Sequence, residues 1–242
     1  MSRVYLVRHG QAGTRKAYDS LSQLGRRQSR LLGEYFVAEG LHFAAAISGA
    51  LARQTQTAAE VRAAYCNAGI LFPEITVDCG WNEFDLTHVY RALAPRLCAD
   101  DPEFRREYEE MRAQARAAEH EHEAVVNRRW LPCDMKLVNA WIEGRYAYNG
   151  ETWPAFRARV VECRSRLEQV ALDGDIVVFT SATPIGIWTA AAMEIHDERA
   201  LRLAGVLRNA SCTVMRLREG QLRLDSFNNI AHLGASDLRT YR

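Results

Sequence analysis

The chain has 242 residues, of which 48% are hydrophobic and 25% are charged, a composition typical of a globular protein with a full hydrophobic core. Its formal net charge of +1 does not favour nucleic acid or a membrane surface as a partner. Six scattered cysteines show no metal-binding spacing, and no apolar run reaches transmembrane length. We therefore expect one α/β domain over residues 1–242 in a reduced, cytoplasmic protein without a signal peptide.

The first predicted element is a short apolar run over residues 4–7, which indicates a buried β-strand. It ends in Arg8, His9 and Gly10. Ligands of open α/β sheets bind beyond the carboxyl ends of the strands, so this strand places Arg8 and His9 where such folds carry their chemistry. Gly10 allows a sharp turn and the close approach of a ligand. For the triplet alone, a strand-end histidine beside a surface arginine is the alternative.

A polar loop over residues 11–20 follows, and its position beside His9 makes it a candidate for lining the site. Ser22 is the expected N-cap of a helix over residues 23–39, which has apolar residues at helical spacing. A second buried strand is predicted over residues 43–47.

The second strand passes into a predicted helix that carries Arg53 near its N-terminus. The free N–H groups and the dipole at a helix start favour anions, and a guanidinium group can form two parallel hydrogen bonds to phosphate. A surface arginine on a helix is the alternative interpretation, and it is the simpler one for this segment alone.

A short third strand, predicted over residues 73–78, leads into a loop where Glu83 and Asp85 lie among aromatic residues. Aromatic neighbours exclude water from a carboxyl group and raise its pKa, as a general acid requires. Exposed loop carboxylates are the alternative interpretation.

Residues 86 to about 149 differ in character from the rest of the chain and predict a helical insertion in the α/β domain. A charged amphipathic helix over residues 101–111 has opposite charges three or four positions apart. His-Glu-His-Glu over residues 120–123 has metal-binding residue types, but histidines two apart on a helix point to different faces, so no metal site is expected. The insertion follows Glu83 directly and is expected to cover the site and determine substrate choice. Its packing aromatics are Trp130, Trp141, Tyr146 and Tyr148.

The second half of the chain returns to alternating helices and strands. Thr152 is the expected N-cap of a helix over residues 153–172, and an apolar strand over residues 175–180 suits the centre of a sheet. Thr183 as N-cap and Pro184 at the first helical position predict another helix start.

The chain ends in a predicted hairpin with strands over residues 209–217 and 222–227 around a Glu219-Gly220 turn. Taken together, the elements predict a three-layer α/β/α sandwich around a mostly parallel mixed sheet, with the helical insertion on one side.

Several of these stretches, in this order, resemble the histidine phosphatase superfamily, also called the phosphoglycerate-mutase-like fold. The resemblance covers almost the whole chain. It is specific because motifs that are weak singly become specific when they occur together at suitable spacing. It is carried by Arg8-His9-Gly10, by Leu51 to Ala58, by Glu83, by Gly150-Glu151-Thr152 and by Asn228 to Leu233.

The resemblance implies a covalent mechanism. Neutral His9 would attack phosphorus and become a phosphohistidine, while Arg8 and Arg53 hold the non-bridging oxygens. Glu83 would protonate the leaving oxygen and then accept a proton from the attacking water. The resemblance implies no metal or other cofactor, because the arginines supply the positive charge. The expected partner is a small phosphorylated substrate, and the sequence carries no indication of the oligomeric state.

One departure from the family concerns its second histidine, which usually follows the fourth motif-bearing strand. This chain has Thr180, Ser181 and Ala182 at that place, and its sequence resembles a subgroup with Thr-Ser-Gly-Gly-Pro-Ile. The Ser181 hydroxyl and the N–H groups from Ala182 onward would bind phosphate without a positive charge. Loss of such a donor typically lowers the rate by about a hundred- to a thousandfold.

Other side chains are candidates for an accessory role. Gln11 follows the triplet directly, and His232 and His88 could supply the missing positive charge. A packing or hydrogen-bonding role is the alternative interpretation for both histidines.

Three functions remain open. We favour cofactor-independent hydrolysis of phosphomonoesters. A degenerate member that binds a phosphorylated ligand without turnover is a credible alternative, because Ser181 replaces the histidine. A phosphoglycerate-mutase-type phosphotransferase is disfavoured, because Gln11-Ala12-Gly13 and Phe84-Asp85-Leu86 replace segments that the glycolytic mutases share.

Overall fold

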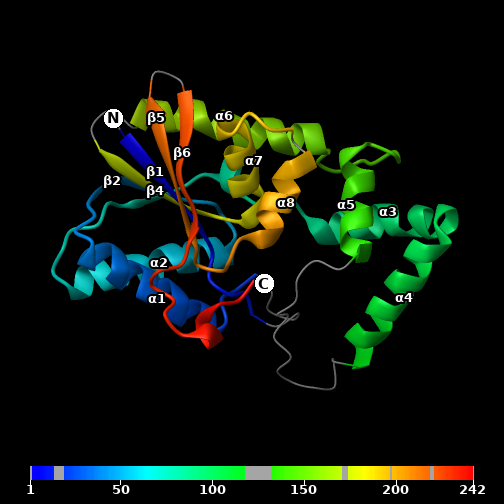
Figure 1. The fold of residues 1–242 in the computed structure, drawn as a ribbon, viewed down its shortest axis with the longest axis horizontal. Coiled ribbons are helices and arrows are strands. Elements are labelled where there is room, and N and C mark those ends of the chain that lie inside the picture. The colour runs from blue at the N-terminus through cyan, green and yellow to red at the C-terminus, as the bar shows by residue number, and fades with distance from the viewer. Residues whose placement is uncertain are drawn as a thin grey trace.

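A six-stranded mixed sheet lies at the centre of the part of the chain that the structure describes (Figure 1). The structure is a computed structural model, and it describes residues 2–13, 19–117, 132–170, 174–196, 198–218 and 221–241. The strand order is β3-β2-β4-β1-β5-β6. The first four strands in this order are parallel to one another, whereas β5 pairs antiparallel with β1 and β6 pairs antiparallel with β5. The strands are β1 (Ser2–Arg8), β2 (Phe43–Ser48), β3 (Ile75–Val77), β4 (Asp175–Thr180), β5 (Cys212–Arg218) and β6 (Gln221–Asn229).

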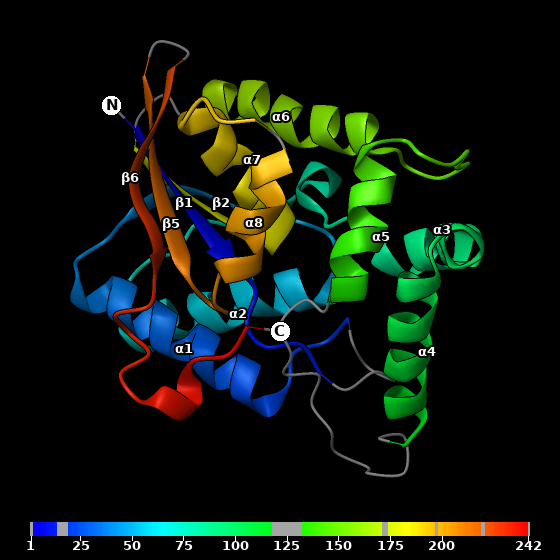
Figure 2. The same ribbon diagram turned by 45° about the vertical axis from the view of Figure 1, so that its right-hand side comes forward.

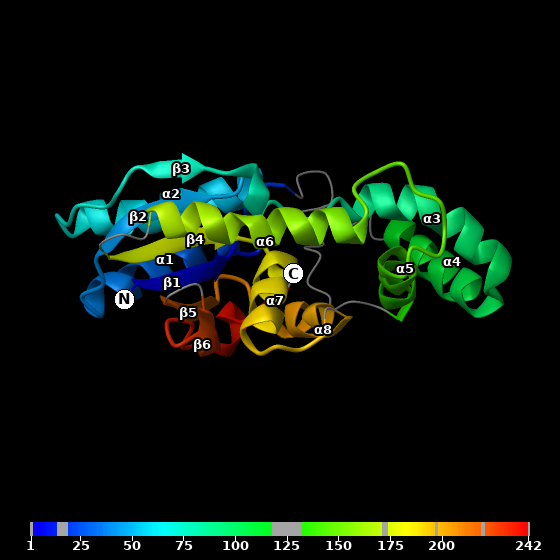
Figure 3. The same ribbon diagram turned by 90° about the horizontal axis from the view of Figure 1, so that it is seen from above.

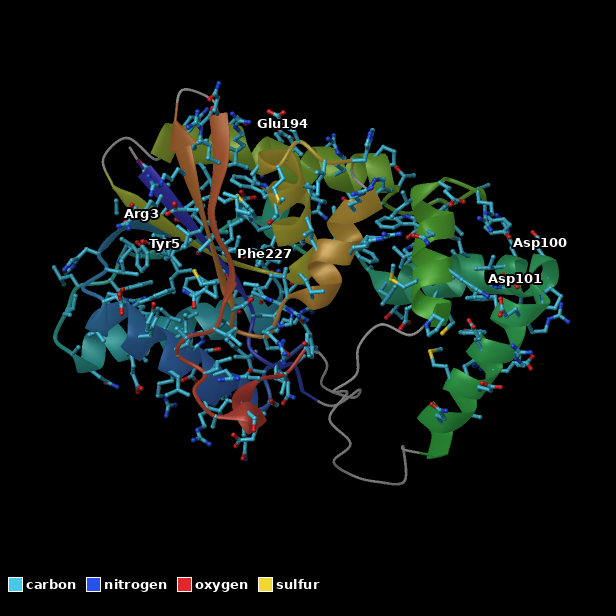
Figure 4. The ribbon with its side chains drawn as sticks, viewed as in Figure 1. Arg3, Tyr5, Asp100, Asp101, Glu194 and Phe227 are labelled. Atoms are coloured by element: carbon cyan, nitrogen blue, oxygen red, sulfur yellow. The ribbon has the colours of Figure 1, made fainter. Side chains whose placement is uncertain are left out.

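The central strands are apolar on both faces, because both faces of the sheet are covered. Along β1, Val4 and Leu6 belong to one hydrophobic cluster, and Tyr5 and Val7 belong to the other. At the amino end of β1, Arg3 pairs with Asp175 of β4 at 2.6 Å, on the side of the molecule where Figure 4 labels Arg3 and Tyr5. The opposite, carboxyl end of β1 carries Arg8 and is buried.

Helices cover the two faces of the sheet (Figure 2). On one face, α1 and α2 pack on Tyr5 and Val7, and on the other, α6 and α7 pack on Val4 and Leu6. The predicted three-layer sandwich is therefore confirmed. The helices of these layers are α1 (Gln23–Ala38), α2 (Ala52–Asn67), α6 (Trp153–Val170) and α7 (Ala182–Ala192), with α8 (Glu198–Val206) packed on α7.

The helix starts test the predicted caps. Ser22 caps α1 by accepting a hydrogen bond from Gly25 N at 2.9 Å, as predicted. The start of α7 is corrected: the helix begins at Ala182 with Ser181 as N-cap, and Thr183 and Pro184 lie inside its first turn. Pro184 fits there because the N–H groups of the first turn have no acceptor within the helix.

The C-terminal hairpin begins three residues later than predicted, at Cys212. Residues 209–211 form a turn instead, in which Ala210 has a φ of 54°, a left-handed conformation that cannot continue a strand. The predicted Glu219-Gly220 turn lies outside the described residues.

The segment predicted as an insertion forms three described helices, α3 (Leu86–Asp100), α4 (Pro102–Ala117) and α5 (Pro132–Ile142). Figures 1 and 3 show them together on one side of the sheet, beyond the ends at which β1 and β4 stop. Asp101, labelled in Figure 4 with Asp100, caps α4 by accepting from Phe104 N. Phe84 stacks on Trp141 of α5 with ring centroids 4.7 Å apart. Residues 120–123 and Trp130 lie outside the described part.

Two short 3₁₀ turns complete the described secondary structure. The first, η2 (Cys79–Trp81), leads to Glu83, and the second, η5 (Ser236–Leu238), lies near the end of the chain. All six cysteines, each of them described, are free thiols.

Candidate active site

His9 is fixed by its backbone at the carboxyl end of β1. Its N–H donates to the Thr180 carbonyl at the end of β4, at 2.9 Å. Its carbonyl accepts from Ala210 N at 3.1 Å and from Asn209 Nδ2 at 3.3 Å. The histidine is therefore anchored between the central strand and the turn that precedes β5.

A buried network continues from this anchor to the end of the chain. Thr240 Oγ1 donates to Asn209 Oδ1 at 2.9 Å, and Thr240 O accepts from Asn209 N at 2.9 Å. Gln28 Nε2 of α1 donates to Leu238 O and to Thr240 Oγ1. The C-terminal segment thus helps to hold the strand end that carries His9.

Gly10 allows α1 and α2 to approach the backbone next to His9 closely. A Cβ atom at Gly10 would lie 2.4 Å from the Gly25 carbonyl oxygen, so no larger residue fits. The Gly10 N–H donates to Thr57 Oγ1 of α2 at 3.0 Å. This close approach places the N-terminus of α2, and with it Arg53, beside the histidine.

The imidazole of His9 has a defined tautomer. Its Nδ1 lies 2.7 Å from Gly10 O, and a carbonyl oxygen only accepts, so the proton is on Nδ1. Its Nε2 accepts from Arg53 Nε at 3.2 Å. Burial, and then the charges of Arg53 and Arg8, hold the pKa of His9 well below its usual value. The ring is therefore neutral at neutral pH and carries its lone pair on Nε2.

Arg53 is also bound by an acidic residue that the sequence analysis missed. Its Nη1 donates to Asp19 Oδ1 at 2.8 Å. The other carboxylate oxygen, Asp19 Oδ2, accepts from Ala52 N in the first turn of α2 at 3.1 Å. Asp19 thus contacts the guanidinium and the helix start that the sequence assigns to phosphate. It lies in a loop without a periodic pattern, so no sequence signal could have identified it.

Arg8 is buried, and its guanidinium donates to the Leu207 carbonyl just after α8. Its positive charge contributes to the low pKa of His9. The two predicted arginines therefore both act electrostatically on His9, and Arg53 contacts its ring directly.

Glu83 lies at the start of α7. Its Oε2 accepts from Thr183 N at 3.1 Å, and its Oε1 accepts from Phe84 N at 3.2 Å. Burial raises the pKa of Glu83 and outweighs the hydrogen bonds from Thr183 and Phe84 and the charge of Arg53, which lower it. The second loop carboxylate, Asp85, caps α3 by accepting from His88 N.

Arg159 of α6 holds the turn that leads to Glu83. Its Nη1 donates to the carbonyl oxygens of Cys79, Gly80 and Asn82 at 2.9 to 3.2 Å. Its Nε and Nη2 pair with the two carboxylate oxygens of Glu151 at 2.7 and 2.8 Å. The Gly-Glu-Thr motif therefore supports the loop that carries Glu83 through Arg159, which the sequence analysis did not single out. A glutamate preceding an arginine by eight residues was the available signal.

Ser181 is buried and follows Thr180, whose carbonyl binds His9. Its Oγ accepts from Gln54 Nε2 at 2.9 Å. Ala182 is the first residue of α7. Both predicted residues therefore lie in the segment that joins β4 to α7, between the contacts made by His9 and Glu83.

The three accessory candidates contact other parts of the structure. Gln11 Oε1 accepts from Ser22 Oγ at 2.8 Å, at the start of α1. His232 bonds to the Ala210 backbone and lies 6.0 Å from the Tyr35 ring, and burial lowers the pKa of His232 to about 4. His88 lies 3.3 Å from Tyr148 Oη in the insertion.

Among the described residues, no group of three or more His, Cys, Asp or Glu side chains is arranged to hold a metal ion. None of the described helices combines the length and apolar character needed to cross a membrane.

Comparison with known proteins identifies sequence and structural relatives. The sequence matches the histidine phosphatase superfamily (branch 1) over residues 4–146 and 132–230. No curated protein shows significant similarity to the sequence.

Solved structures share the fold over nearly their full length. YhfR from Bacillus stearothermophilus has a TM-score of 0.64 at 16% identity, with 96% of this chain and 99% of that chain covered. A mycobacterial glucosyl-3-phosphoglycerate phosphatase, in complex with inorganic phosphate, has a TM-score of 0.61 at 21% identity, with 97% and 100% covered. Phosphoserine phosphatase from Entamoeba histolytica, in complex with phosphoserine, has a TM-score of 0.59 at 16% identity, with 96% and 100% covered.

Proposed function

Because the chain belongs to the histidine phosphatase superfamily, branch 1, we propose that it hydrolyses phosphomonoesters through a phosphohistidine on His9. The observation that carries the proposal is the neutral imidazole, with its proton held on Nδ1 by Gly10 O and its Nε2 lone pair against Arg53. A small phosphorylated metabolite is the proposed substrate class. Two of the structural relatives are phosphatases for glucosyl-3-phosphoglycerate and phosphoserine, which supports this class.

The first step transfers the phosphoryl group to the enzyme. His9 Nε2 attacks phosphorus, the bond from phosphorus to the leaving oxygen breaks, and Glu83 donates its proton to that oxygen. The raised pKa of Glu83 favours the protonated acid that this step requires. Arg53 Nε, which now donates to His9 Nε2, turns its hydrogen bond to a phosphoryl oxygen and frees the lone pair.

The second step releases phosphate. Water attacks phosphorus, its proton passes to the carboxylate of Glu83, and the bond between phosphorus and Nε2 breaks. Arg8, Arg53, the Ser181 hydroxyl and the N–H of Ala182 are the proposed ligands of the phosphoryl oxygens in both steps. The two guanidinium groups offset the negative charge, so the proposed mechanism uses no metal or other cofactor.

A second candidate function is the binding of a phosphorylated ligand without turnover. Two observations favour it: Ser181 supplies no positive charge where the family usually has a histidine, and Asp19 contacts Arg53. Lost charge lowers transition-state stabilisation more than it lowers binding of the ground state.

Hydrolysis of p-nitrophenyl phosphate by the wild type and by the His9→Ala variant separates the two functions. We expect slow turnover by the wild type and none by the variant. Mass spectrometry after rapid quenching should detect acid-labile phosphate on His9. Absence of this adduct, together with no His9-dependent hydrolysis of a broad panel of phosphorylated metabolites, would leave ligand binding as the function.

A further inference from the structure

We infer that Gln54 is a positioning residue that makes the Ser181 hydroxyl a hydrogen-bond donor to the phosphoryl group. In this arrangement a glutamine and a serine together supply the donor that the resembled family takes from its second histidine. The inference rests on the proposed site, because it assigns a direction to one of the hydrogen bonds that would bind phosphate there.

The amide of Gln54 can adopt only one orientation. Its Oε1 accepts from Leu51 N at 3.2 Å, and a flipped amide would place an NH₂ group against that N–H. Its Nε2 has two hydrogens, which are donated to Ser181 Oγ at 2.9 Å and to Trp81 O at 3.1 Å. The side chain is fully buried, so water cannot replace either contact.

This orientation determines what the serine can do. Because Ser181 Oγ accepts from Gln54, its own hydrogen must point in another direction. The segment from Thr180 to Thr183 contacts His9 N at one end and the Glu83 carboxylate at the other. Ser181 therefore stands in the segment between the contacts of the proposed nucleophile and the proposed acid, and a phosphoryl oxygen bound at this segment would accept the proton of its hydroxyl.

The surrounding chain provides a place for the glutamine. A Cβ atom at Gly49 would lie 2.1 Å from Gln54 Oε1, so the absence of a side chain at Gly49 leaves the space that the amide occupies. The Trp81 carbonyl that accepts from Gln54 also accepts from Thr180 Oγ1 at 2.6 Å. The glutamine therefore belongs to a buried network that includes both the strand end and the acid's loop.

The test measures binding of inorganic phosphate by isothermal titration calorimetry in the full chain. Ser181→Ala and Gln54→Met should each weaken binding by about three- to tenfold, because one neutral hydrogen bond is lost or loses its direction. The double variant should bind no more weakly than Ser181→Ala, because both substitutions act through the same hydroxyl. The control is Thr189→Val, which removes a buried hydroxyl from α7, the helix that Ser181 precedes. This hydroxyl donates to Ile185 O, and the variant should keep wild-type affinity for phosphate.

Gln54→Glu gives a readout that a purely structural role would not produce. A carboxylate at this position accepts from Ser181 and so turns the hydroxyl away from phosphate. Affinity relative to wild type should recover as the pH falls and the new carboxyl group becomes a donor. Unchanged binding by Ser181→Ala, additive losses in the double variant, or a pH-independent loss in Gln54→Glu would each overturn the inference.

The phosphate-binding test of Gln54 can fail or succeed independently of the proposed hydrolysis. A wild type that binds phosphate but hydrolyses nothing would contradict the proposed reaction, whereas the phosphate measurements would still decide the role of Gln54. A wild type that does not bind phosphate would overturn the inference. Thermal unfolding of each variant checks that it is folded, and Ser181→Ala with Gln54→Glu suffices if Gln54→Met does not fold.

Discussion

At the scale of single residues, burial keeps two histidines neutral, and one of them lies outside the proposed chemistry. His232 has a pKa of about 4, against 6.5 for an unperturbed histidine, chiefly because it is buried. The unfolded chain therefore binds a proton there below pH 6.5 that the folded chain does not. The folded state loses stability as the pH falls from about 6.5 to about 4.

We predict that His232→Asn flattens this part of the pH profile of stability. The shift from 6.5 to about 4 corresponds to about 3 kcal/mol of unfolding free energy. Urea unfolding between pH 4 and pH 7 measures it, and His9 contributes equally to both proteins. The exposed His42→Asn variant should keep the wild-type profile. Identical profiles for wild type and His232→Asn would show that His232 is not the source.

The negative charge of Asp19 beside Arg53 is expected to weaken phosphate binding. Its carboxylate contacts Arg53 Nη1 and Ala52 N, and phosphate at the proposed site would be repelled by it or would displace it. Asp19→Asn keeps an acceptor for Arg53 but removes the negative charge. We expect phosphate to bind about three- to tenfold more tightly, with the gain shrinking at high salt. Weaker binding in calorimetry would indicate that Asp19 instead holds Arg53 in place.

At the scale of elements, the contact between the end of β1 and α1 depends on two glycines. A Cβ atom at Gly25 would lie 2.1 Å from Gln11 O, which is backbone and cannot move aside easily. We predict that Gly25→Ala destabilises the fold by about 1–3 kcal/mol or more, and that hydrolysis decreases because His9 is displaced. The matched control is Gly205→Ala in α8, where an added Cβ atom would meet no atom within 4 Å beyond its own helix backbone and chain neighbours. Equal stability of the two variants in urea unfolding would contradict the tight contact.

The elements also show how far the sequence determines the structure. Apolar runs predicted β1 and β4, and Ser22 predicted the start of α1, because these signals are local. The predicted start of α7 was wrong by two residues, because Pro184 is tolerated throughout a first turn. The predicted start of β5 was wrong by three residues, because the turn at Ala210 has no sequence mark. The short helix α8 was not predicted.

The residues of the proposed site also differ in how far the sequence predicts them. Arg8, His9, Arg53 and Glu83 stand in motifs at strand and helix ends, so the sequence could single them out. Their partners were not predicted, since Asp19 and Gln54 act through contacts between elements distant in sequence, and Arg159 reaches the Glu83 loop across about 80 residues although its partner Glu151 is only eight residues away. Such contacts depend on packing, which a local pattern does not encode.

At the scale of the whole molecule, aromatic packing joins the helices of the predicted insertion to the loop that carries Glu83. Phe84 follows Glu83 directly and lies between Trp141 of α5 and Phe156 of α6. A change in the insertion can therefore alter the position of the acid. This connection supports the proposal that the insertion covers the site and influences substrate choice.

We predict that Trp141→Ala lowers kcat for p-nitrophenyl phosphate more than it weakens phosphate binding, because it disturbs Glu83 and leaves Arg53 in place. Trp141→Phe keeps the stacking surface and should retain most of the activity. Circular dichroism and thermal unfolding identify any general loss of structure, since removal of a buried tryptophan costs about 3–5 kcal/mol. A parallel loss of both parameters would place the insertion's influence elsewhere.

The buried network of Gln28, Asn209 and Thr240 joins residues that are synthesised at very different times. The ribosome produces His9 and Gln28 early, whereas Thr240 follows Gln28 by 212 residues. At typical synthesis rates of 5–20 residues per second, this interval lasts about 10 to 40 s. Throughout that time the nascent strand end lacks Thr240, and for most of it the strand end also lacks Asn209. His9, the proposed nucleophile, therefore takes its final position only after Thr240 has been synthesised, and a ribosome stalled between the codons for Asn209 and Thr240 would carry a strand end without this network.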